Sequence, residues 1–106
     1  MSALLCRAQD ANEYSLPLDH GDVLLVATDG LWDNVDLKQI VYCVTSPERK
    51  SPQGMVDSVV ALATRLSWDS NHNSPFAKKA RENQLQFTGG KPDDITVVLA
   101  TVEREA

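Results

Sequence analysis

Two short runs, Val23–Thr28 and Ile95–Val102, constrain the fold most strongly, because both alternating sets of side chains in each run are mainly apolar. Val, Ile and Thr favour β-strands, and a strand that is apolar on both faces is expected to be covered on both sides. An Asp-Gly pair at positions 29–30 follows the first run, and an Asp-Asp pair at positions 93–94 precedes the second. The sequence therefore predicts two buried strands, each with a carboxylate near one end.

The main candidate functional groups of this sequence are the carboxylates at positions 29, 33, 93 and 94. Strand ends that are distant in the sequence can meet in space, and carboxylates gathered there would suit a hard cation. Since no His or Cys is clustered with them, these oxygen donors favour Mg²⁺ or Mn²⁺ over zinc. Composition alone leaves a second interpretation open, in which Asp29 and Asp93 are turn residues. Asp33 would then cap a helix, and Asp94 would hydrogen-bond its own loop.

The size and charge of the chain limit the functions that we expect of it. A length of 106 residues predicts one domain at most, and a formal charge of −5 argues against nucleic-acid or anionic-membrane partners. Cys6 and Cys43 form neither a disulfide framework nor a zinc motif, and Cys43 is expected in the core. No run reaches the ~18 apolar residues of a membrane span and no targeting segment is recognised, so we expect an intracellular protein.

Helical spacing of apolar residues predicts a helix that ends at about Thr45. Its apolar stripe consists of Leu37, Ile40, Val41 and Val44. The N-cap is placed at Asp33 or Asn34, with Asp36 in the first turn, where a carboxylate suits the helix dipole.

Two further helices are predicted downstream. The segment Gly54–Ser67 has a broad apolar stripe that includes Met55, Val59, Leu62 and Leu66. Ser74 followed by Pro75 is a typical helix start, and this third helix is expected to reach about Asn83. In it, the inward residues would be Phe76, Ala77 and Ala80.

The remaining N-terminal part is weakly patterned, with a short strand predicted at Ser2–Ala8 and an extended segment at Asn12–Leu18. These elements do not make a self-sufficient sheet, because the strands would lack neighbours and one sheet face would lack a cover. We therefore expect the chain to be part of a larger domain.

Two motifs resemble a known family. The segment Val26–Asn34 resembles the Asp-Gly motif in the second half of the metal-dependent, type 2C, protein serine/threonine phosphatases, and Gly90–Val98 resembles their closing motif. The stretch from Ser74 to Asp94 is similar, more narrowly, to the mitochondrial and plastid branch that includes the yeast PTC-seven phosphatase. The resemblance extends from about Gly21 to Val102 with intact order and spacing.

The resemblance implies a function and a fold. Asp29 and Asp93 match aspartates of a binuclear Mn²⁺ or Mg²⁺ centre, and Asp33 matches an aspartate of a weaker third metal site. In the family, a metal-bound hydroxide attacks a phosphoserine or phosphothreonine ester of a protein substrate. The implied fold class is α+β, as part of a four-layer α/β/β/α sandwich of antiparallel sheets with outer helices. The branch resemblance also implies a mitochondrial or plastid location.

Part of the family pattern is not recognisable here. The family's first half supplies an Asp-Gly pair that bridges both metals, an arginine for the phosphate and usually a histidine, whereas Arg7, His20 and His72 receive no catalytic role. We therefore expect the C-terminal portion of a phosphatase domain, inactive or weakly active alone, with the missing N-terminal half as a possible partner. The alternative is a truncated or degenerate non-catalytic module that binds a partner through its exposed sheet edge.

Overall fold

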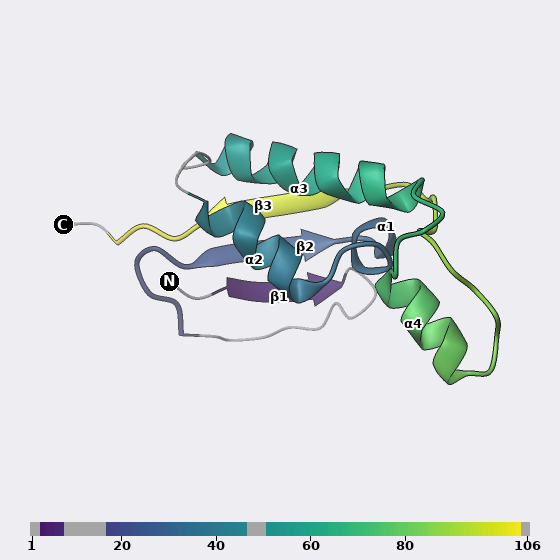
Figure 1. Cartoon of the computed structure of the whole chain (residues 1–106). Coiled ribbons are helices and arrows are strands. Elements are labelled where there is room, and N and C mark those ends of the chain that lie inside the picture. Colours follow the sequence, from purple (N-terminus) through teal and green to yellow (C-terminus); the bar gives the residue numbers. More distant parts are fainter. Residues whose placement is uncertain (1–2, 8–16, 47–50, 105–106) are drawn as a thin grey trace.

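The computed structural model describes residues 3–7, 17–46 and 51–104, and in these ranges the chain forms one three-stranded sheet with helices. The strands are β1 (Ala3–Arg7), β2 (Val23–Ala27) and β3 (Val97–Thr101), in the order β1-β2-β3. β1 pairs with β2 in parallel, whereas β2 and β3 are antiparallel, so the sheet is mixed and β2 is its central strand (Figure 1). The resemblance implied antiparallel sheets, and only the β2–β3 pair has that orientation.

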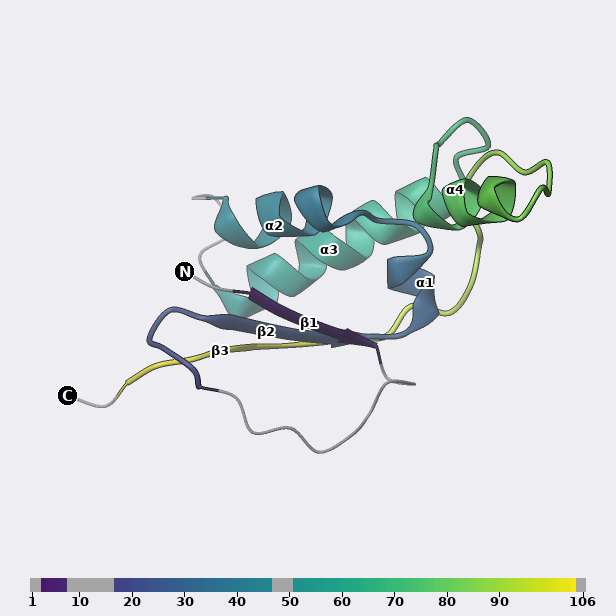
Figure 2. The same ribbon diagram turned by 90° about the horizontal axis from the view of Figure 1, so that it is seen from below.

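In the described part of the chain, four helices accompany the sheet: α1 (Asp29–Trp32), α2 (Leu37–Thr45), α3 (Pro52–Ser67) and α4 (Pro75–Glu82). α2 and α3 cover one face of the sheet, and none of the described helices lies on the other face (Figure 2). α4 lies beyond the end of the sheet, on the side where β2 leads into α1 (Figure 1). The predicted α+β class is confirmed. No described helix has the length and apolar character needed to cross a membrane.

Local sequence explains where the helices begin. Asp36 caps α2, because its carboxylate accepts from the Gln39 backbone while the Gln39 side chain accepts from the Asp36 backbone. The prediction that Asp33 or Asn34 caps this helix is therefore wrong. Ser51 and Ser74 cap α3 and α4 and are each followed by proline at the first helical position, as predicted for α4.

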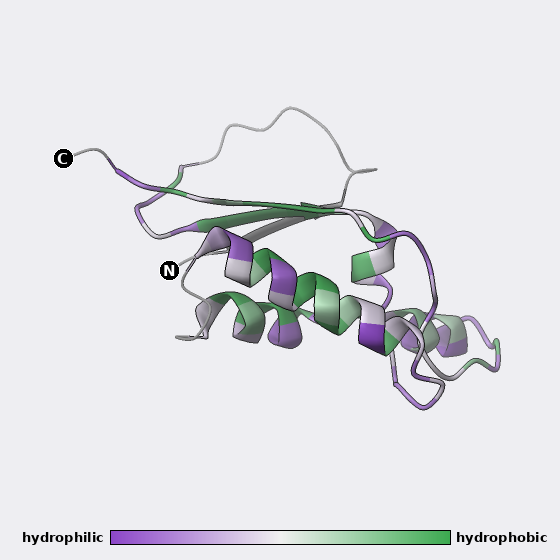
Figure 3. Ribbon diagram, turned by 90° about the horizontal axis from the view of Figure 1, so that it is seen from above, coloured by the Kyte–Doolittle hydropathy of each residue, from purple (hydrophilic) through white to green (hydrophobic). Residues whose placement is uncertain are grey.

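The two faces of the sheet differ in exposure. Val23, Leu25 and Ala27 of β2 are buried beneath the helices, whereas Val98 of β3, on the opposite face, is 64% exposed. Figure 3 shows the sheet edge-on, with α2 and α3 on one side of it. Among the described residues, helices cover one face of these strands, so the expectation of a cover on both faces is not met by this part of the chain, which agrees with the expectation of one face without a cover.

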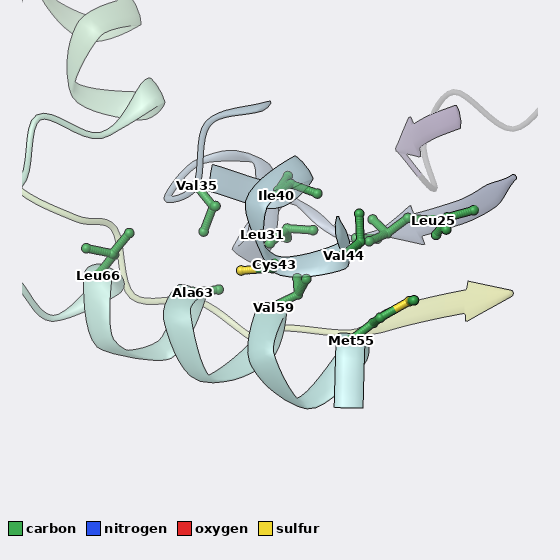
Figure 4. Close-up of a cluster of buried hydrophobic side chains, with 12 residues drawn as sticks. Leu25, Leu31, Val35, Ile40, Cys43, Val44, Met55, Val59, Ala63 and Leu66 are labelled. Atoms are coloured by element: carbon green, nitrogen blue, oxygen red, sulfur yellow. The ribbon is translucent and has the colours of Figure 1, made fainter. Parts of the chain in front are cut away.

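The core lies between the sheet and the two long helices (Figure 4). Cys43 is buried in it, as predicted. Leu37 is 57% exposed and Val41 is also exposed, so half of the predicted α2 stripe points outward. The stripe is rotated because α2 packs against α3 as well as over the sheet, which turns Ile40, Cys43 and Val44 inward.

The remaining predictions agree in type and differ in bounds. The strand predicted at Val23–Thr28 is β2 and ends one residue earlier, at Ala27. The strand predicted at Ile95–Val102 is β3, which begins at Val97 because residues 95 and 96 belong to the preceding loop. The short N-terminal strand is confirmed as β1. Most of the extended segment predicted at Asn12–Leu18 lies outside the described residues.

Candidate functional site

The antiparallel pairing of β2 and β3 brings two acidic segments to the same end of the sheet. The end of β2 is paired with the start of β3, through Ala27 and Val97. Beyond this pair, Thr28 continues the ladder, because its backbone N–H donates to Thr96 O at 3.1 Å. The Thr28 hydroxyl accepts from Thr96 N at 3.1 Å and donates to Asp94 O at 3.2 Å. The segment that carries Asp29 is therefore held beside residues 93–96.

Gly30 allows the closest approach between these two segments. A Cβ atom at this position would lie 2.2 Å from Asp94 O and 2.9 Å from a side-chain carbon of Ile95. Such distances are far inside van der Waals contact, so no larger residue fits while the Asp94 backbone lies there. The glycine of the Asp-Gly motif is thus required by packing, since its φ is not in the left-handed region.

Asp29 and Asp93, the two principal predicted ligands, flank this contact in different environments. Asp29 is the first residue of α1, and its carboxylate oxygen Oδ1 is buried. Asp93 is exposed, and its Oδ1 accepts a hydrogen bond from the backbone N–H of Asp94 at 2.8 Å. The loop hydrogen bond that we expected of Asp94 is therefore made by the Asp93 carboxylate.

Asp33, the third predicted ligand, lies at the C-terminal end of α1 and so does not cap the start of a helix. Its Oδ2 lies 3.7 Å from Nζ of Lys91, with side-chain exposures of 19% and 42% respectively. Its backbone carbonyl accepts from the Phe76 N–H at 3.0 Å, which attaches the first turn of α4 to α1.

Asn34 joins the two acidic segments, a role that differs from the helix cap considered for it from the sequence. It is fully buried. Its Nδ2 donates to Gly30 O at 2.9 Å and to Lys91 O at 2.8 Å, and its Oδ1 accepts from Lys91 N at 2.7 Å. His72 Nε2 bonds the Asn34 carbonyl at 2.8 Å. Asn34 therefore fixes the loop before Asp93 relative to α1, through a partner 57 positions away.

The loop that contains Lys91 is also fixed to the end of α3. A Cβ on Gly90 would lie 2.0 Å from Leu66 O, and the Gly90 N–H donates to Asp69 O at 2.9 Å. The buried Ser74 hydroxyl donates to Gly89 O at 2.7 Å while it caps α4. The loop around Gly89 and Gly90 is thus packed against its neighbours.

These contacts decide how far the predicted metal ligands come together. Asp29 and Asp93 are brought to one end of the sheet, and Asp33 follows at the other end of α1. Within residues 17–46 and 51–104, however, no three Asp, Glu, His or Cys side chains gather into a group that could hold a metal ion. The oxygen donors of Asp29, Asp33 and Asp93 are of the type that binds a hard cation. The Lys91 ammonium lies 3.7 Å from the Asp33 carboxylate. The described residues therefore supply part of a donor set.

The chain is similar in sequence to known protein phosphatases. The chain is 44% identical over 101 residues to the protein phosphatase PTC7 homolog fig of Drosophila willistoni, covering 91% of this chain and 32% of that protein. It is 40% identical over 98 residues to the human protein phosphatase PTC7 homolog, covering 90% and 32% respectively. The chain thus spans about a third of the length of these curated relatives.

A solved structure is also similar. The X-ray structure of the photosystem II phosphatase PBCP matches with a TM-score of 0.76 and 26% sequence identity, over 83% of this chain and 38% of that one. No family model matches the chain.

Proposed function

We propose that this chain is the C-terminal portion of a type 2C protein phosphatase of the PTC7 branch and contributes to dephosphorylation of phosphoserine and phosphothreonine in proteins. Its similarity to the PTC7 homologs in sequence and to the phosphatase PBCP in fold supports this proposal. The observation that carries the proposal is the β2–β3 register, which holds Asp29 beside the segment of Asp93. The proposed substrates are phosphorylated proteins, and the branch resemblance favours a mitochondrial or plastid location.

The proposed metal ligands of this chain are Asp29 and Asp93, with Asp33 at a further position. They would hold Mn²⁺ or Mg²⁺ within a binuclear centre, which activates water and neutralises phosphoryl charge when bound. The role of the chain itself is to position these carboxylates. Thr28 fixes the Asp94 backbone, Gly30 leaves room for it, and Asn34 holds the preceding loop.

The remaining ligands are proposed to come from the part of the relatives' domain that this chain does not match. Two carboxylates near one sheet end hold a dication weakly, because six or more oxygen ligands are usual for such ions. We therefore expect the chain on its own to hydrolyse phosphate esters weakly or not at all. Strong Mn²⁺-dependent turnover by the isolated chain, abolished by Asp29→Asn, would contradict this division of the site.

A chimera tests the proposal directly. This chain replaces the matching third of the human PTC7 homolog, and turnover of a phosphoserine peptide is measured as a function of Mn²⁺ concentration. We expect metal-dependent hydrolysis that falls about 100-fold or more with Asp29→Asn or Asp93→Asn, since metal catalysis supplies several kcal/mol of transition-state stabilisation.

The matched control is Asp57→Asn. Asp57 is an exposed aspartate on α3 that bonds the Gln53 side chain, so its replacement removes the same charge away from the site. The proposal fails if the folded chimera is inactive, or if Asp57→Asn lowers turnover as much as Asp29→Asn does.

A second candidate function is a non-catalytic module that binds a partner. The observation that favours it is the open sheet face, where the apolar side chain of Val98 is mostly exposed. An inactive chimera, together with one-to-one binding of the isolated chain to the unmatched part of the relative, would favour this function.

A further inference from the structure

The segment that follows α4 forms an open cleft together with that helix. The cleft has a volume of about 450 Å³, which is within the range of about 300–1,000 Å³ that ligand sites usually have. Its lining combines one guanidinium group with amide, hydroxyl and apolar side chains: Arg81, Gln84, Leu85, Gln86, Phe87 and Thr88. All of these residues are exposed except Phe87, which is half-buried. The cleft therefore offers a cation and an apolar surface side by side.

The turn after α4 is fixed by its own backbone bonds. The Gln84 N–H donates to Arg81 O at 3.0 Å and the Leu85 N–H donates to Ala80 O at 2.9 Å, which is the Schellman pattern of a helix C-terminus. Gln84 occupies the left-handed position of this motif with a φ of 65°, where glycine is the usual residue. The residue after that position commonly packs back against its helix, whereas Leu85 is 63% exposed. The turn thus holds an apolar side chain outward at the cleft.

Arg81 presents a cation in a fixed position. Its Nη1 donates to Phe87 O at 2.9 Å, and its Nη2 donates to Asn73 Oδ1. Both acceptors are neutral, so they position the guanidinium without compensating its charge. A guanidinium has five N–H donors in a planar fork that matches a carboxylate, and donors beyond these two bonds remain for a ligand.

The charge around the cleft is opposite to that of the whole chain. Residues 75–91 hold four basic side chains and one acidic side chain, whereas the whole chain has a formal charge of −5. The basic residues are Lys78, Lys79, Arg81 and Lys91, and the acidic residue is Glu82. Lys78 is exposed and lies three positions before Arg81 on α4, so the two share one face of the helix. An acidic ligand therefore complements this surface.

A row of contacts connects the cleft to the candidate site. The Phe87 ring lies edge-on to the Phe76 ring, with ring centroids 5.0 Å apart and an interplanar angle of 87°. Lys91 Nζ lies 4.5 Å from the Phe76 centroid and 3.7 Å from Asp33 Oδ2. An extended chain advances about 3.3 Å per residue, so a peptide whose phosphorylated residue lies at the carboxylates of the site reaches the cleft with residues about four to six positions away.

We propose that this cleft docks an acidic segment of the phosphoprotein substrate, in which a carboxylate pairs with Arg81 and a neighbouring apolar side chain covers Leu85. The inference rests on the proposed function in one respect, the identity of the ligand as part of a substrate. The cleft selects substrates that carry acidic and apolar residues about four to six positions from the phosphorylated residue. Because these contacts lie outside the reacting centre, they set which substrates bind.

The experiment measures binding of three fluorescent phosphoserine peptides to the full chain by anisotropy, in EDTA so that no metal contributes. The first peptide carries Glu-Leu-Glu about four to six positions from the phosphoserine on both sides, and the others carry Gln-Leu-Gln or Glu-Ser-Glu there. We expect the first peptide to bind about three- to tenfold more tightly than either of the others, since one exposed charge pair and one partly buried leucine each contribute modestly. Its advantage over Gln-Leu-Gln should decrease as salt concentration rises. Equal affinities for the three peptides would overturn the proposal.

Two variants remove the two halves of the cleft separately. Arg81→Met removes the guanidinium, and Leu85→Ser removes the exposed apolar side chain without opening a cavity in the core. Each is expected to lower the affinity for the Glu-Leu-Glu peptide about three- to tenfold. In the wild-type chain, this peptide should shift the backbone amide signals of residues 84–88 in NMR spectra. Shifts confined to other parts of the chain would overturn the proposal without relying on any variant.

The matched control is Arg104→Met at the opposite end of the sheet. Arg104 forms an exposed ion pair with Asp19 at 3.6 Å, so this variant removes one positive charge far from the cleft. We expect it to leave the affinity for the Glu-Leu-Glu peptide unchanged. A loss equal to that in Arg81→Met would mean that net charge alone is responsible, and would overturn the proposal.

The chimera with the human PTC7 homolog separates this inference from the proposed function. In it, the ratio of kcat/KM for the Glu-Leu-Glu peptide to that for the Gln-Leu-Gln peptide should fall toward one with Arg81→Met. Metal-dependent turnover that does not discriminate between these peptides would overturn the inference and leave the proposed function intact. An inactive chimera that still binds the Glu-Leu-Glu peptide more tightly would overturn the proposed function, and with it the assignment of this ligand to a substrate.

Discussion

Replacement of Asn34 by alanine tests whether the acidic segments are held together as described. Asn34→Ala removes three hydrogen bonds, one to Gly30 O, one to Lys91 O and one from Lys91 N. A neutral hydrogen bond contributes about 1 kcal/mol net, and a buried group left without its partner costs about 1–3 kcal/mol. We therefore expect the free energy of unfolding to fall by about 3 kcal/mol. This is a large share of the roughly 5–15 kcal/mol that is typical of a domain.

Urea denaturation followed by tryptophan fluorescence measures this loss. Trp32 is a suitable reporter, because it is half-buried next to the site and its Nε1 donates to Ala27 O at 3.0 Å. The control is Asn83→Ala, which removes one exposed hydrogen bond to Lys79 O at the end of α4. A loss of about 0.5 kcal/mol or less is expected there, as for most surface substitutions.

The isosteric variant Asn34→Asp separates hydrogen bonding from packing. It fills the same volume but directs a carboxylate oxygen at the carbonyls of Gly30 and Lys91, so its destabilisation should equal or exceed that of Asn34→Ala. Burial raises the pKa of the introduced carboxyl, so the charge penalty is absent below about pH 4, grows as pH rises from there to the raised value, and is constant above it. A loss under about 1 kcal/mol for Asn34→Ala, or a pH-independent Asn34→Asp, would refute the reasoning.

Two further predictions concern packing and the open face. Gly90→Ala places a methyl group against Leu66 O and is expected to destabilise the chain by about 2 kcal/mol or more. Gly21→Ala meets no atom within 4 Å and should lose only the ~1–2 kcal/mol of its left-handed backbone, so similar losses in thermal unfolding would count against the packing argument. The isolated chain should self-associate through its open sheet face, and Val98→Lys should shift it toward monomer in sedimentation velocity. A wild-type monomer at high concentration would contradict this.

The parts of the fold that depend on local pattern could be predicted from the sequence. The apolar runs around Val23 and Val97 are strands, and the Ser74-Pro75 start of α4 is correct. The four-residue α1 was missed, because Asp-Gly is also the pattern of a turn. The inward face of α2 was mistaken, since periodicity identifies an apolar stripe but does not show that a second helix shares it.

The candidate site was predictable in its carboxylates and hidden in its supporting contacts. Asp29, Asp33 and Asp93 stand in recognisable motifs, and their roles as metal ligands remain predictions. Asn34 has no local signature, because both of its Lys91 contacts lie 57 positions away. The Lys91–Phe76 contact also joins separate elements. Such groups become visible only when the loop and helix are placed together in space.

The position of β3 beside β2 has a consequence for the order in which this chain folds. Thr28 and Thr96, which align the two acidic segments, are 68 positions apart, so loop closure must precede any contact between them. α2 and α3 can form earlier from local contacts, during synthesis, while the carboxylates are still apart. Until β3 docks, one edge of β2 lacks its partner strand. Such an unpaired edge can pair with another chain, which leads to aggregation, and it is a surface that chaperones bind. The site is thus completed in a late folding step, and its geometry is present only in chains in which β3 has docked.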